Sequence, residues 1–541
     1  MLKQKNIFAF FFSFSLAFIF VACSETEAEK DLKEDTPVQL VAPTHLYFER
    51  VTETMLKLGW RSDQGGQTSF TVFKDGEILG ETGPDQREYL ITSGLETGTI
   101  YNIGVRAEGD GEKYLSSEVA VAQYNMIPKS QLPSVSVEAV VGTPSCIAVT
   151  ARLRDTGNFG DQISCGLCWS EENQIPTIED GWLSGPEIPE IGTTMQVIPN
   201  LYLEYGKTYA VRNYIKSEKG IHYGPIIKAS LGEEPQAVNF NWTRVENSEL
   251  PSEIELFTTT DKLSGRNFRA WYAKADLRGT GIEFRTNVPA ELQTIDTQAA
   301  SFWGDCYLMV NGGYFASGQH TGIAINDYVV NGRINNARGS LRQSDKENNE
   351  IYLTARGIFG VDDNGEASVY WATGSKPDYF DRPIPSIKGE QKFRLSLNEY
   401  ESASYVEWMP RAAISAGPVL LKDGKRPFDF TNTPNGDEYY YSNYEFIAYD
   451  IFDPESICDR TAIGCTQDGE VIIFICDGRI ASSEGADMEE LAMIMKGLGC
   501  VQALNLDGGG STGMMAGSVH LGDLTPENRK VSSTVGFFRR K

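Results

Sequence analysis

Two short apolar runs near the end of the chain flank a segment with helical periodicity. Residues 471–476 are wholly apolar and residues 501–506 largely so, as expected for strands buried on both faces. Between them, apolar residues recur at helical spacing: Met488, Leu491, Ala492, Met495 and Leu498. The acids Asp487, Glu489 and Glu490 fall in or near the first turn, where the helix dipole favours them. Gly497 and Gly499 can end the helix. A strand, a helix and a strand in this order predict a crossover between two parallel strands.

The loops after these two strands are therefore expected at one edge of the sheet, the edge where α/β sheets bind ligands. The first loop begins with DGR (residues 477–479) and the second with DGGGST (residues 507–512). Two carboxylates, an arginine and a run of glycine amides would meet there, and such amides can hold a phosphate. The alternative interpretation is that each Asp-Gly pair is only a turn. It weighs less for the second loop, since three glycines followed by Ser511 and Thr512 exceed what a turn needs.

Two further glycine-rich motifs precede these loops. They are VNGGYFA (residues 310–316) and AISAGPVL (residues 413–420), the latter followed by DGK. Neither has the spacing of a nucleotide-binding GxGxxG motif or of a Walker lysine. NGGYF could also be a plain hairpin that places Tyr314 or Phe315 in the core.

The N-terminus has the pattern of a targeting segment. Lys3 and Lys5 precede an apolar run over residues 7–21, which is short for a membrane-spanning helix. The run ends in FVAC (residues 20–23), which resembles the lipobox of a bacterial lipoprotein, with Cys23 as the lipidated residue. The alternative is a signal anchor with an incidental cysteine. We expect a signal peptide at 1–22, an acidic linker at 23–37, and attachment to the outer membrane, with the acids after Cys23 resembling surface-export signals.

Two β-modules are expected before the C-terminal unit. Residues 38–125 contain short alternating strands, a core Trp60, an Asp75-Gly76 hairpin and a corner ending in Tyr101, and they resemble a fibronectin type III domain. Residues 131–232 repeat the pattern, with Tyr209 in the equivalent corner. Exposed aromatic side chains there could instead bind glycans, but aromatic residues in such strands usually belong to the core. The predicted fold is multidomain: two all-β immunoglobulin- or fibronectin-like sandwiches, then a mixed α/β (α+β) catalytic domain at 236–541.

Charge and composition exclude several functions. The chain has 541 residues and a formal net charge of −26, which argues against a nucleic-acid partner, because that affinity comes mainly from Lys and Arg. Only four histidines occur, far apart in sequence, so a His-rich zinc site is not expected. Cys165 and Cys168 have CxxC spacing, but they fall on opposite faces of an expected strand, which argues against a redox or zinc role.

The C-terminal motifs together resemble the phosphodiester glycosidase family. The resemblance rests on NGGYF, AGPVLLKDGK, RTAIG, DGR, ELAMIMKGLGC and NLDGGGST, and it spans roughly residues 300 to 540. It implies a hydrolase that cleaves a sugar from a sugar–phosphodiester on a glycan or glycoconjugate and leaves a phosphomonoester. Carried over to this chain, the implied pocket contains Asn311, Gly312, Gly313, Tyr314, Phe315, Gly417, Arg460, Asp477, Arg479, Asp507, Gly508, Gly509, Gly510, Ser511 and Thr512.

The residue types suit that chemistry. Asp507 would act as base or nucleophile and Asp477 as its partner or orienter, with Asn311 beside them in the catalytic group. Arg460 or Arg479 would clamp the phosphate, helped by the amides of Gly508, Gly509 and Gly510. No cofactor is required, although Asp477 and Asp507 could hold a divalent cation. The alternative function is a noncatalytic glycan-binding surface lipoprotein that uses the same pocket only for capture.

Overall fold

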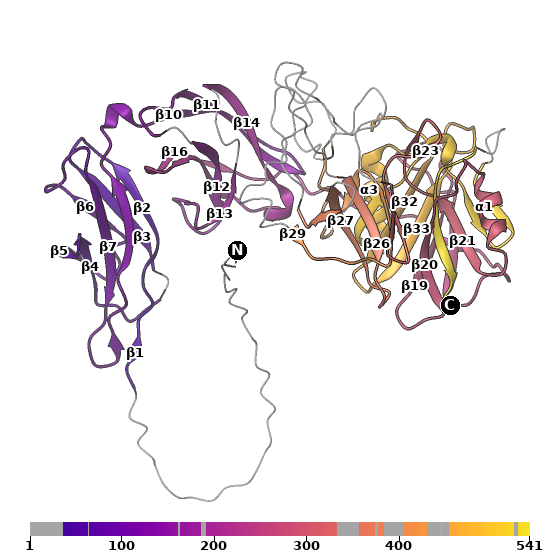
Figure 1. Ribbon diagram of the computed structural model, residues 1–541, viewed down its shortest axis with the longest axis horizontal. Helices are drawn as coiled ribbons and strands as arrows, with labels where there is room; N and C mark the ends of the chain where they lie inside the picture. Colours follow the sequence, from indigo (N-terminus) through magenta and orange to yellow (C-terminus); the bar gives the residue numbers. More distant parts are fainter. Residues whose placement is uncertain are drawn as a thin grey trace, which may run out of the picture.

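The computed structural model describes residues 36–62, 64–160, 163–184, 191–332, 356–373, 377–382, 405–429, 445, 454–523 and 529–541. Figure 1 shows two β-modules followed by a larger unit built from several sheets. Among the described residues, no helix has the length and apolar character needed to cross a bilayer. Cys23 and the expected signal peptide lie outside the described residues.

The first β-module packs two antiparallel sheets around one apolar core. Its strands are β1 (Val38–Gln39), β2 (Thr44–Arg50), β3 (Leu56–Arg61), β4 (Ser69–Lys74), β5 (Glu77–Thr82), β6 (Glu88–Ile91), β7 (Ile100–Glu108), β8 (Tyr114–Leu115) and β9 (Ala120–Asn125). The sheets have the orders β2-β3-β6 and β5-β4-β7-β9. Trp60 and Phe70, one from each sheet, meet in the core with ring centroids 5.3 Å apart. The Tyr101 hydroxyl accepts a hydrogen bond from Glu96 N at 2.9 Å, which closes the predicted corner.

The second β-module repeats this arrangement. Its strands are β10 (Ser134–Gly142), β11 (Cys146–Asp155), β12 (Ser164–Ser170), β13 (Gly181–Ser184), β14 (Gly192–Pro199), β15 (Tyr209–Ser217) and β16 (Gly220–Ala229). They form sheets of order β10-β11-β14 and β13-β12-β15-β16. The Tyr209 hydroxyl accepts from Glu204 N at 2.8 Å, as Tyr101 does in the first module. Cys165 and Cys168 both lie on β12 and are free thiols, in agreement with the strand interpretation.

The C-terminal unit contains three larger sheets. The first has the order β17-β18-β19-β33-β32-β34-β31, the second β20-β37-β21-β35-β36 and the third β25-β24-β30-β26-β27-β28-β29. The strands are β17 (Thr243–Arg244), β18 (Ile254–Thr259), β19 (Ala270–Asp276), β20 (Ile282–Asn287), β21 (Cys306–Asn311), β24 (Ile323–Asn326), β25 (Val329–Gly332), β26 (Arg356–Val361), β27 (Ala367–Thr373), β28 (Asp378–Phe380), β29 (Tyr405–Val406), β30 (Ala412–Ala416), β31 (Val419–Leu421), β32 (Arg460–Thr466), β33 (Glu470–Cys476), β34 (Cys500–Asn505), β35 (Met514–Ala516), β36 (Val519–Leu521) and β37 (Thr534–Arg539); β22 (Phe315–Ala316) and β23 (Gln319–His320) form a separate hairpin.

One apolar core lies between these three sheets. It joins Ile473 of β33, Phe537 of β37 and Phe359 of β26, all fully buried. On the other face of the first sheet, Phe474 packs against helix α3 (Met488–Gly497), so β33 is buried on both faces as its apolar run predicts. The second helix in the described part of the unit, α1 (Ile295–Ser301), covers the outer face of the second sheet.

The predicted crossover is present, with one added strand. Both β33 and β34 pair antiparallel with β32, so they run parallel to each other with β32 between them. Asp487 begins α3 with a capping box to Glu490, and Gly499 follows its end with a φ of 85°. The loops after β33 and β34 therefore do leave the same edge of the sheet.

The mixed α/β description is not confirmed for the C-terminal unit. Every strand pairing within its described residues is antiparallel, and only α1 and α3 are α-helical there. The multidomain, β-rich organisation does hold. The sequence pattern predicted helix α3 correctly. It did not predict how the other strands of the unit pair, because no sequence pattern marks those pairings.

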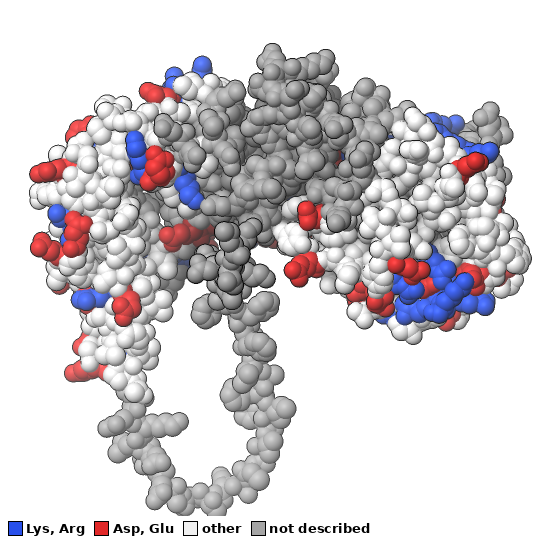
Figure 2. Space-filling model, viewed as in Figure 1, with Lys and Arg blue, Asp and Glu red and all other residues white. Residues whose placement is uncertain are grey.

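Surface charges on the C-terminal unit are largely paired. Figure 2 shows basic and acidic side chains gathered on this unit near the chain's C-terminus. Ion pairs in this part of the chain include Arg411–Glu283 at 3.2 Å and Lys541–Asp305 at 2.7 Å. The Lys541–Asp305 pair is exposed at the lysine and contributes little to stability, whereas Glu283 in the other pair is buried.

Candidate active site

The loop after β34 connects to the NGGYF segment after β21. Asp507 N donates to Gly312 O at 3.0 Å, and the Asp507 carbonyl accepts from the side-chain amide of Asn311. The Asp507 carboxylate accepts from Gly508 N at 3.0 Å and is partly exposed. The loop thus holds a carboxylate at the surface of the unit while its backbone is tied to a strand of another sheet.

The glycine amides of this loop are not bare. Gly509 N donates to Asp459 O at 2.9 Å, and Thr512 N donates to Gly509 O at 3.0 Å. With Gly508 N bound to Asp507 and Ser511 N donating to Gly508 O at 3.2 Å, most of the run is already satisfied inside the protein. Of the three amides expected to bind phosphate, those of Gly508 and Gly509 are thus engaged within the protein, while Gly510 N has no such bond among the described residues. The glycines instead let neighbouring groups lie close to the loop backbone.

Arg479 lies over this loop. Its Nε and Nη2 donate to Asp459 Oδ2 at 3.1 and 3.0 Å, and its side chain remains 56% exposed. A Cβ on Gly509 would lie 3.0 Å from Arg479 Nη2, so the guanidinium sits close to this glycine, and the φ of 60° at Gly509 favours glycine at this position. The DGR and DGGGST loops therefore meet, as the crossover predicts. Asp459, which orients Arg479, is a residue that the sequence analysis missed, although it directly precedes RTAIG.

A second arginine, also missed, flanks the loop. Arg529 is exposed, and its Nη1 would lie 3.4 Å from a Cβ on Gly510. Its guanidinium lies 5.4 Å from the centroid of the Phe315 ring, which places Phe315 beneath a cation. Its neighbours in sequence, Asn528 and Lys530, form no motif, so only the fold reveals it.

Asn311 is a buried connector. It has no exposed surface, and its Oδ1 accepts from Thr461 Oγ1 at 2.7 Å while its amide donates to the Asp507 carbonyl. Thr461 Oγ1 also lies 3.3 Å from Thr512 Oγ1. Asn311 therefore ties β21, β32 and the 507–512 loop together and positions Asp507.

The Tyr314 hydroxyl forms hydrogen bonds inside the protein, near Asp507. Its hydroxyl donates to Gly417 O and accepts from the Asn505 side chain at 3.0 Å, and Asn505 also reaches Gly417 O at 2.8 Å. Burial, reinforced by the nearby Asp507 charge, raises the pKa of Tyr314 well above its usual value. The phenol is therefore neutral at physiological pH and fixes the segment at Gly417.

The two glycines of NGGYF are required for packing. A Cβ on Gly312 would lie 2.5 Å from Ser533 Oγ, and one on Gly313 would lie 2.4 Å from Ser415 O. Gly313 N donates to Ser533 Oγ at 3.1 Å. Ser533 in turn lies 3.3 Å from His320 Nδ1, and burial lowers the pKa of His320 to about 4, so this ring is neutral near pH 7.

Asp477 is held by other parts of the protein. Its side chain is buried, with Oδ2 accepting from Arg269 Nε at 2.5 Å and Oδ1 accepting from Asp523 N at 2.6 Å. Burial raises the pKa of Asp477, while these donors oppose the rise. Since both carboxylate oxygens are already engaged, Asp477 does not offer a cation a ready ligand. Among the described residues, no group of three His, Cys, Asp or Glu side chains could hold a metal ion.

Arg460 is also turned inward. It is 4% exposed, and it donates to the carbonyls of Ala486 and Ser456. It thereby links β32 to the segment that leads into α3. Ser511 is buried too, and among the described residues its hydroxyl has no hydrogen-bond partner.

Residues 304–538 match the phosphodiester glycosidase family. The search of curated proteins returned no match. Among solved structures, the chain is similar to the zebrafish N-acetylglucosamine-1-phosphodiester alpha-N-acetylglucosaminidase catalytic domain auto-inhibited by its pro-peptide, at 19% identity and a TM-score of 0.33, with 55% of this chain and 88% of that chain covered.

Two other solved structures are similar over longer parts of the chain. A hypothetical protein from Synechocystis has 13% identity and a TM-score of 0.35, with 92% of each chain covered. A putative exported protein from Burkholderia pseudomallei has 12% identity and a TM-score of 0.33, with 76% of this chain and 97% of that chain covered. At these scores the superpositions are partial, so the family match is the comparison that bears on function.

Proposed function

We propose that the C-terminal unit is a phosphodiester glycosidase that releases a sugar from a sugar-1-phosphodiester and leaves a phosphomonoester. The observation that supports this most is Asp507, a partly exposed carboxylate on a glycine loop with Arg479 over Gly509 and Arg529 beside Gly510. A loop that carries a carboxylate and has two arginines beside its glycines suits a substrate with an anomeric carbon next to an anionic phosphate. The match of residues 304–538 to the phosphodiester glycosidase family supports the same reaction class.

In this proposal the two arginines bind the phosphate. Guanidinium groups pair with phosphate oxygens through charge-assisted, often bidentate, hydrogen bonds. Arg479 is presented by Asp459, and Arg529 is supported on Phe315. The phosphate monoester leaves as a weakly basic group, so the reaction needs less general-acid help than cleavage of an ordinary glycoside.

Asp507 is the proposed reacting carboxylate. In one route Asp507 takes a proton from water, and that water bonds to the anomeric carbon as the bond from that carbon to the phosphate oxygen breaks. In the other route Asp507 bonds to the anomeric carbon as the phosphomonoester leaves, and water then replaces Asp507 on that carbon. The hydroxyl of the released sugar then comes from water, and the phosphomonoester keeps its original four oxygens. Asp477, Asp459 and Asn311 act through contacts that position the loops.

The decisive experiment is hydrolysis of a methyl phosphodiester of N-acetylglucosamine 1-phosphate by the purified chain in ¹⁸O-water. Incorporation of the label at the sugar hydroxyl is the result expected from cleavage at the anomeric carbon. Label in the phosphate would indicate a phosphodiesterase and overturn the glycosidase assignment. Saturable binding of this substrate and of other sugar-1-phosphodiesters without any turnover would favour the alternative of a noncatalytic glycan-binding lipoprotein.

We further infer that the chain is anchored to the outer membrane through Cys23, with the two β-modules as fibronectin type III-like spacers. The inference rests on the FVAC sequence and the acidic segment that follows it. Metabolic labelling with a radioactive fatty acid should mark the wild-type chain and not the Cys23→Ser variant. Equal labelling of both proteins would contradict lipidation at Cys23. Proteolysis of intact cells then tests whether the chain faces outward.

A further inference from the structure

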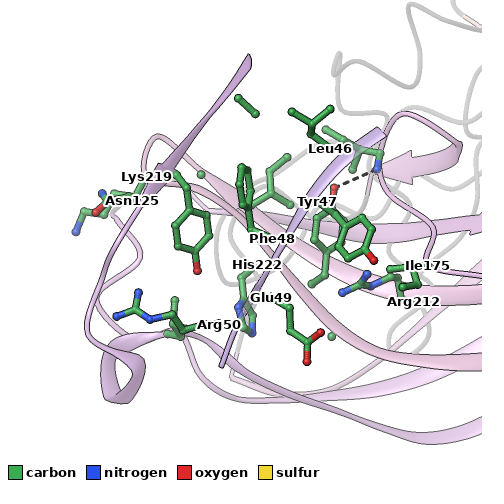
Figure 3. Close-up of a pocket in the computed structure, with 18 of the residues that line it drawn as sticks. Leu46, Tyr47, Phe48, Glu49, Arg50, Asn125, Ile175, Arg212, Lys219 and His222 are labelled. Atoms are coloured by element: carbon green, nitrogen blue, oxygen red, sulfur yellow. Dashed lines mark hydrogen bonds between the residues drawn. The ribbon is translucent and has the colours of Figure 1, made fainter. Parts of the chain in front are cut away.

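A cavity of about 650 Å³ lies between the first and second β-modules. Figure 3 shows side chains from both modules around it, including Tyr47, Phe48 and Arg50 from β2 and Arg212 and His222 from the second module. Its volume falls within the range of roughly 300–1,000 Å³ that is usual for small-molecule sites. The cavity is remote in sequence from the C-terminal loops and plays no part in the proposed hydrolysis.

Two arginines with buried side chains line this cavity, Arg50 and Arg212. The Arg50 side chain is 3% exposed, and its Nε and Nη2 donate to the carbonyls of Thr52 and Glu53 at 2.7 Å each, so Arg212 is the one with donors left over. Arg212 is 9% exposed, and its Nε is buried without a hydrogen-bond partner among the described residues. Its Nη1 donates to Pro176 O at the long distance of 3.5 Å, and its guanidinium carbon lies 4.4 Å from the centroid of the Tyr223 ring. Stacking engages the face of the guanidinium and leaves its edge, where the N–H donors lie, largely unused.

The acids near Arg212 are engaged elsewhere. Glu49, at the rim, is 60% exposed and pairs with Lys57 at 2.5 Å, and Glu179 accepts from His45 N at 2.7 Å. Within the described part of the chain, no ion pair includes Arg212. Burial lowers the pKa of Arg212, and the nearby Glu49 charge opposes this shift without reversing it. A buried charge without a partner is unfavourable, so an anion entering the cavity would gain a strong and specific contact.

Aromatic side chains form a large part of the remaining lining, which also contains aliphatic and charged residues. Tyr47, Phe48, Tyr124, Phe159 and Tyr223 all line the cavity, and the Phe48 and Tyr124 ring centroids are 4.9 Å apart. The Tyr223 hydroxyl accepts from Ile178 N at 3.2 Å, which leaves its own proton available to donate. Flat apolar surfaces with a few hydroxyl donors fit the faces and edges of a sugar ring. Burial also lowers the pKa of His222 to about 4, so this neighbour does not compete with Arg212 for the anion.

We propose that the cavity between the two β-modules binds an acidic saccharide of one or two units, with its carboxylate or phosphate on Arg212 and its ring against the aromatic side chains. The anion explains the unpaired guanidinium, and the ring explains the aromatic lining and the volume. Either anion satisfies the same guanidinium edge, so the two are separated by the choice of probe.

The test is calorimetric titration of the full chain with D-glucuronate, digalacturonate and glucose 6-phosphate, with glucose and cellobiose as neutral probes. At least one acidic probe should bind, and Arg212→Met should weaken that binding at least tenfold. Arg154→Met removes an exposed arginine from the same module and should leave binding unchanged. Arg479→Met should also leave it unchanged, which separates this cavity from the C-terminal site.

Thermal unfolding shows whether a loss of binding in Arg212→Met comes from the missing guanidinium or from a destabilised fold. Because Arg212 lacks a buried partner, Arg212→Met should melt at the same temperature as the wild type or higher, which a structural arginine would not allow. The proposal is overturned if no acidic probe binds at about 10 mM, if neutral sugars bind as tightly as acidic ones, or if Arg212→Met binds normally.

Discussion

The tyrosine corners of the two β-modules and the Asn311 contact of the C-terminal unit join polar groups that lie very different distances apart in sequence. In each module a tyrosine hydroxyl bonds to a backbone N–H five residues earlier, Tyr101 to Glu96 and Tyr209 to Glu204. In the C-terminal unit the Asn311 amide reaches Asp507, 196 residues away. A short loop closes at little entropic cost, whereas the second contact requires several loops to be assembled first. Damage to the Tyr101 corner should therefore stay local, and damage to the Asn311 contact should disturb the site.

The largest effect is expected for Asp507→Asn. Asn keeps the volume of Asp and both backbone contacts of residue 507, but it removes the charge needed in a base or nucleophile. Turnover of a sugar-1-phosphodiester should fall by about 10²–10⁴-fold, with the melting temperature unchanged. Steady-state hydrolysis and circular dichroism check this. Near-normal turnover in the folded variant would make Asp507 a turn residue, and the exposed Glu484 the next carboxylate to examine.

Arg479 is expected to bind the substrate phosphate, whereas Arg460 is expected to stabilise the fold. Arg479→Met should lower kcat/KM for the phosphodiester roughly 10–100-fold, since a charge-assisted hydrogen bond contributes about 1.5–3 kcal/mol, and it should barely change the melting temperature. Arg460→Met should mainly lower the melting temperature, because its guanidinium supports the carbonyls of Ala486 and Ser456. Arg244→Met, at an exposed arginine of the same unit, is the control. Equal losses of kcat/KM in Arg244→Met and Arg479→Met would contradict the proposal that Arg479 binds the phosphate.

Asn311→Ala tests the long-range contact directly. The change leaves the Asp507 carbonyl and the Thr461 hydroxyl without their partner in a buried position, so the free energy of unfolding should fall by about 2 kcal/mol or more. Hydrogen exchange should rise in the 507–512 loop as well as near residue 311, and turnover should fall with it. Asn364→Ala, at an exposed turn, should do neither. Exchange confined to residue 311 would contradict the long-range coupling.

One half-buried histidine in each region gives a pH comparison. Burial lowers the pKa of both His222, in the second module, and His320, in the C-terminal unit, to about 4. Between that value and the unfolded pKa of about 6.5, the unfolded state binds more protons, so stability falls as the pH drops through this window. Each His→Gln variant should remove on the order of 2 kcal/mol from that loss. Urea unfolding at pH 7 and pH 4.5 measures it, and identical pH profiles for variant and wild type would show that the ring is already solvated.

Parts of this architecture follow from local sequence patterns. The apolar run of β33, the capping box at Asp487 and the Tyr101 and Tyr209 corners depend on residues close together in the chain, and each was predictable. The meeting of the DGR and DGGGST loops followed from the handedness and direction of the crossover. The insertion of β32 between the two parallel strands did not, because strand order depends on pairing between distant segments.

The roles of individual site residues were much harder to predict. Arg460 and Arg479 look alike in sequence, yet one bonds to backbone carbonyls and the other is exposed over Gly509. Asp477 looks as available as Asp507, but Arg269, 208 residues earlier, takes one of its oxygens. Arg529 has no motif at all. Exposure and pairing depend on residues brought in from distant strands, so no local pattern encodes them.

The smallest effects are expected at the two tyrosine corners. Tyr101→Phe keeps the buried ring and loses one hydrogen bond to Glu96 N, which lies at an exposed residue where water can replace it, so the cost should be about 1 kcal/mol. Its consequences should stay in the first module. Tyr209→Phe should cost a similar amount, but it also loosens the segment whose Leu203 carbonyl accepts from Lys425 Nζ of the C-terminal unit at 2.7 Å.

Hydrogen exchange distinguishes the two corners. In Tyr101→Phe, faster exchange should be limited to peptides of residues 90–105, whereas in Tyr209→Phe it should extend from residues 200–210 to the segment around Lys425. Turnover should be unchanged in both, since neither corner contacts the 507–512 loop. If Tyr101→Phe also raised exchange in the C-terminal unit, the modules would be coupled to it as tightly as its own loops are, and the difference between local and long-range polar contacts would lose its meaning.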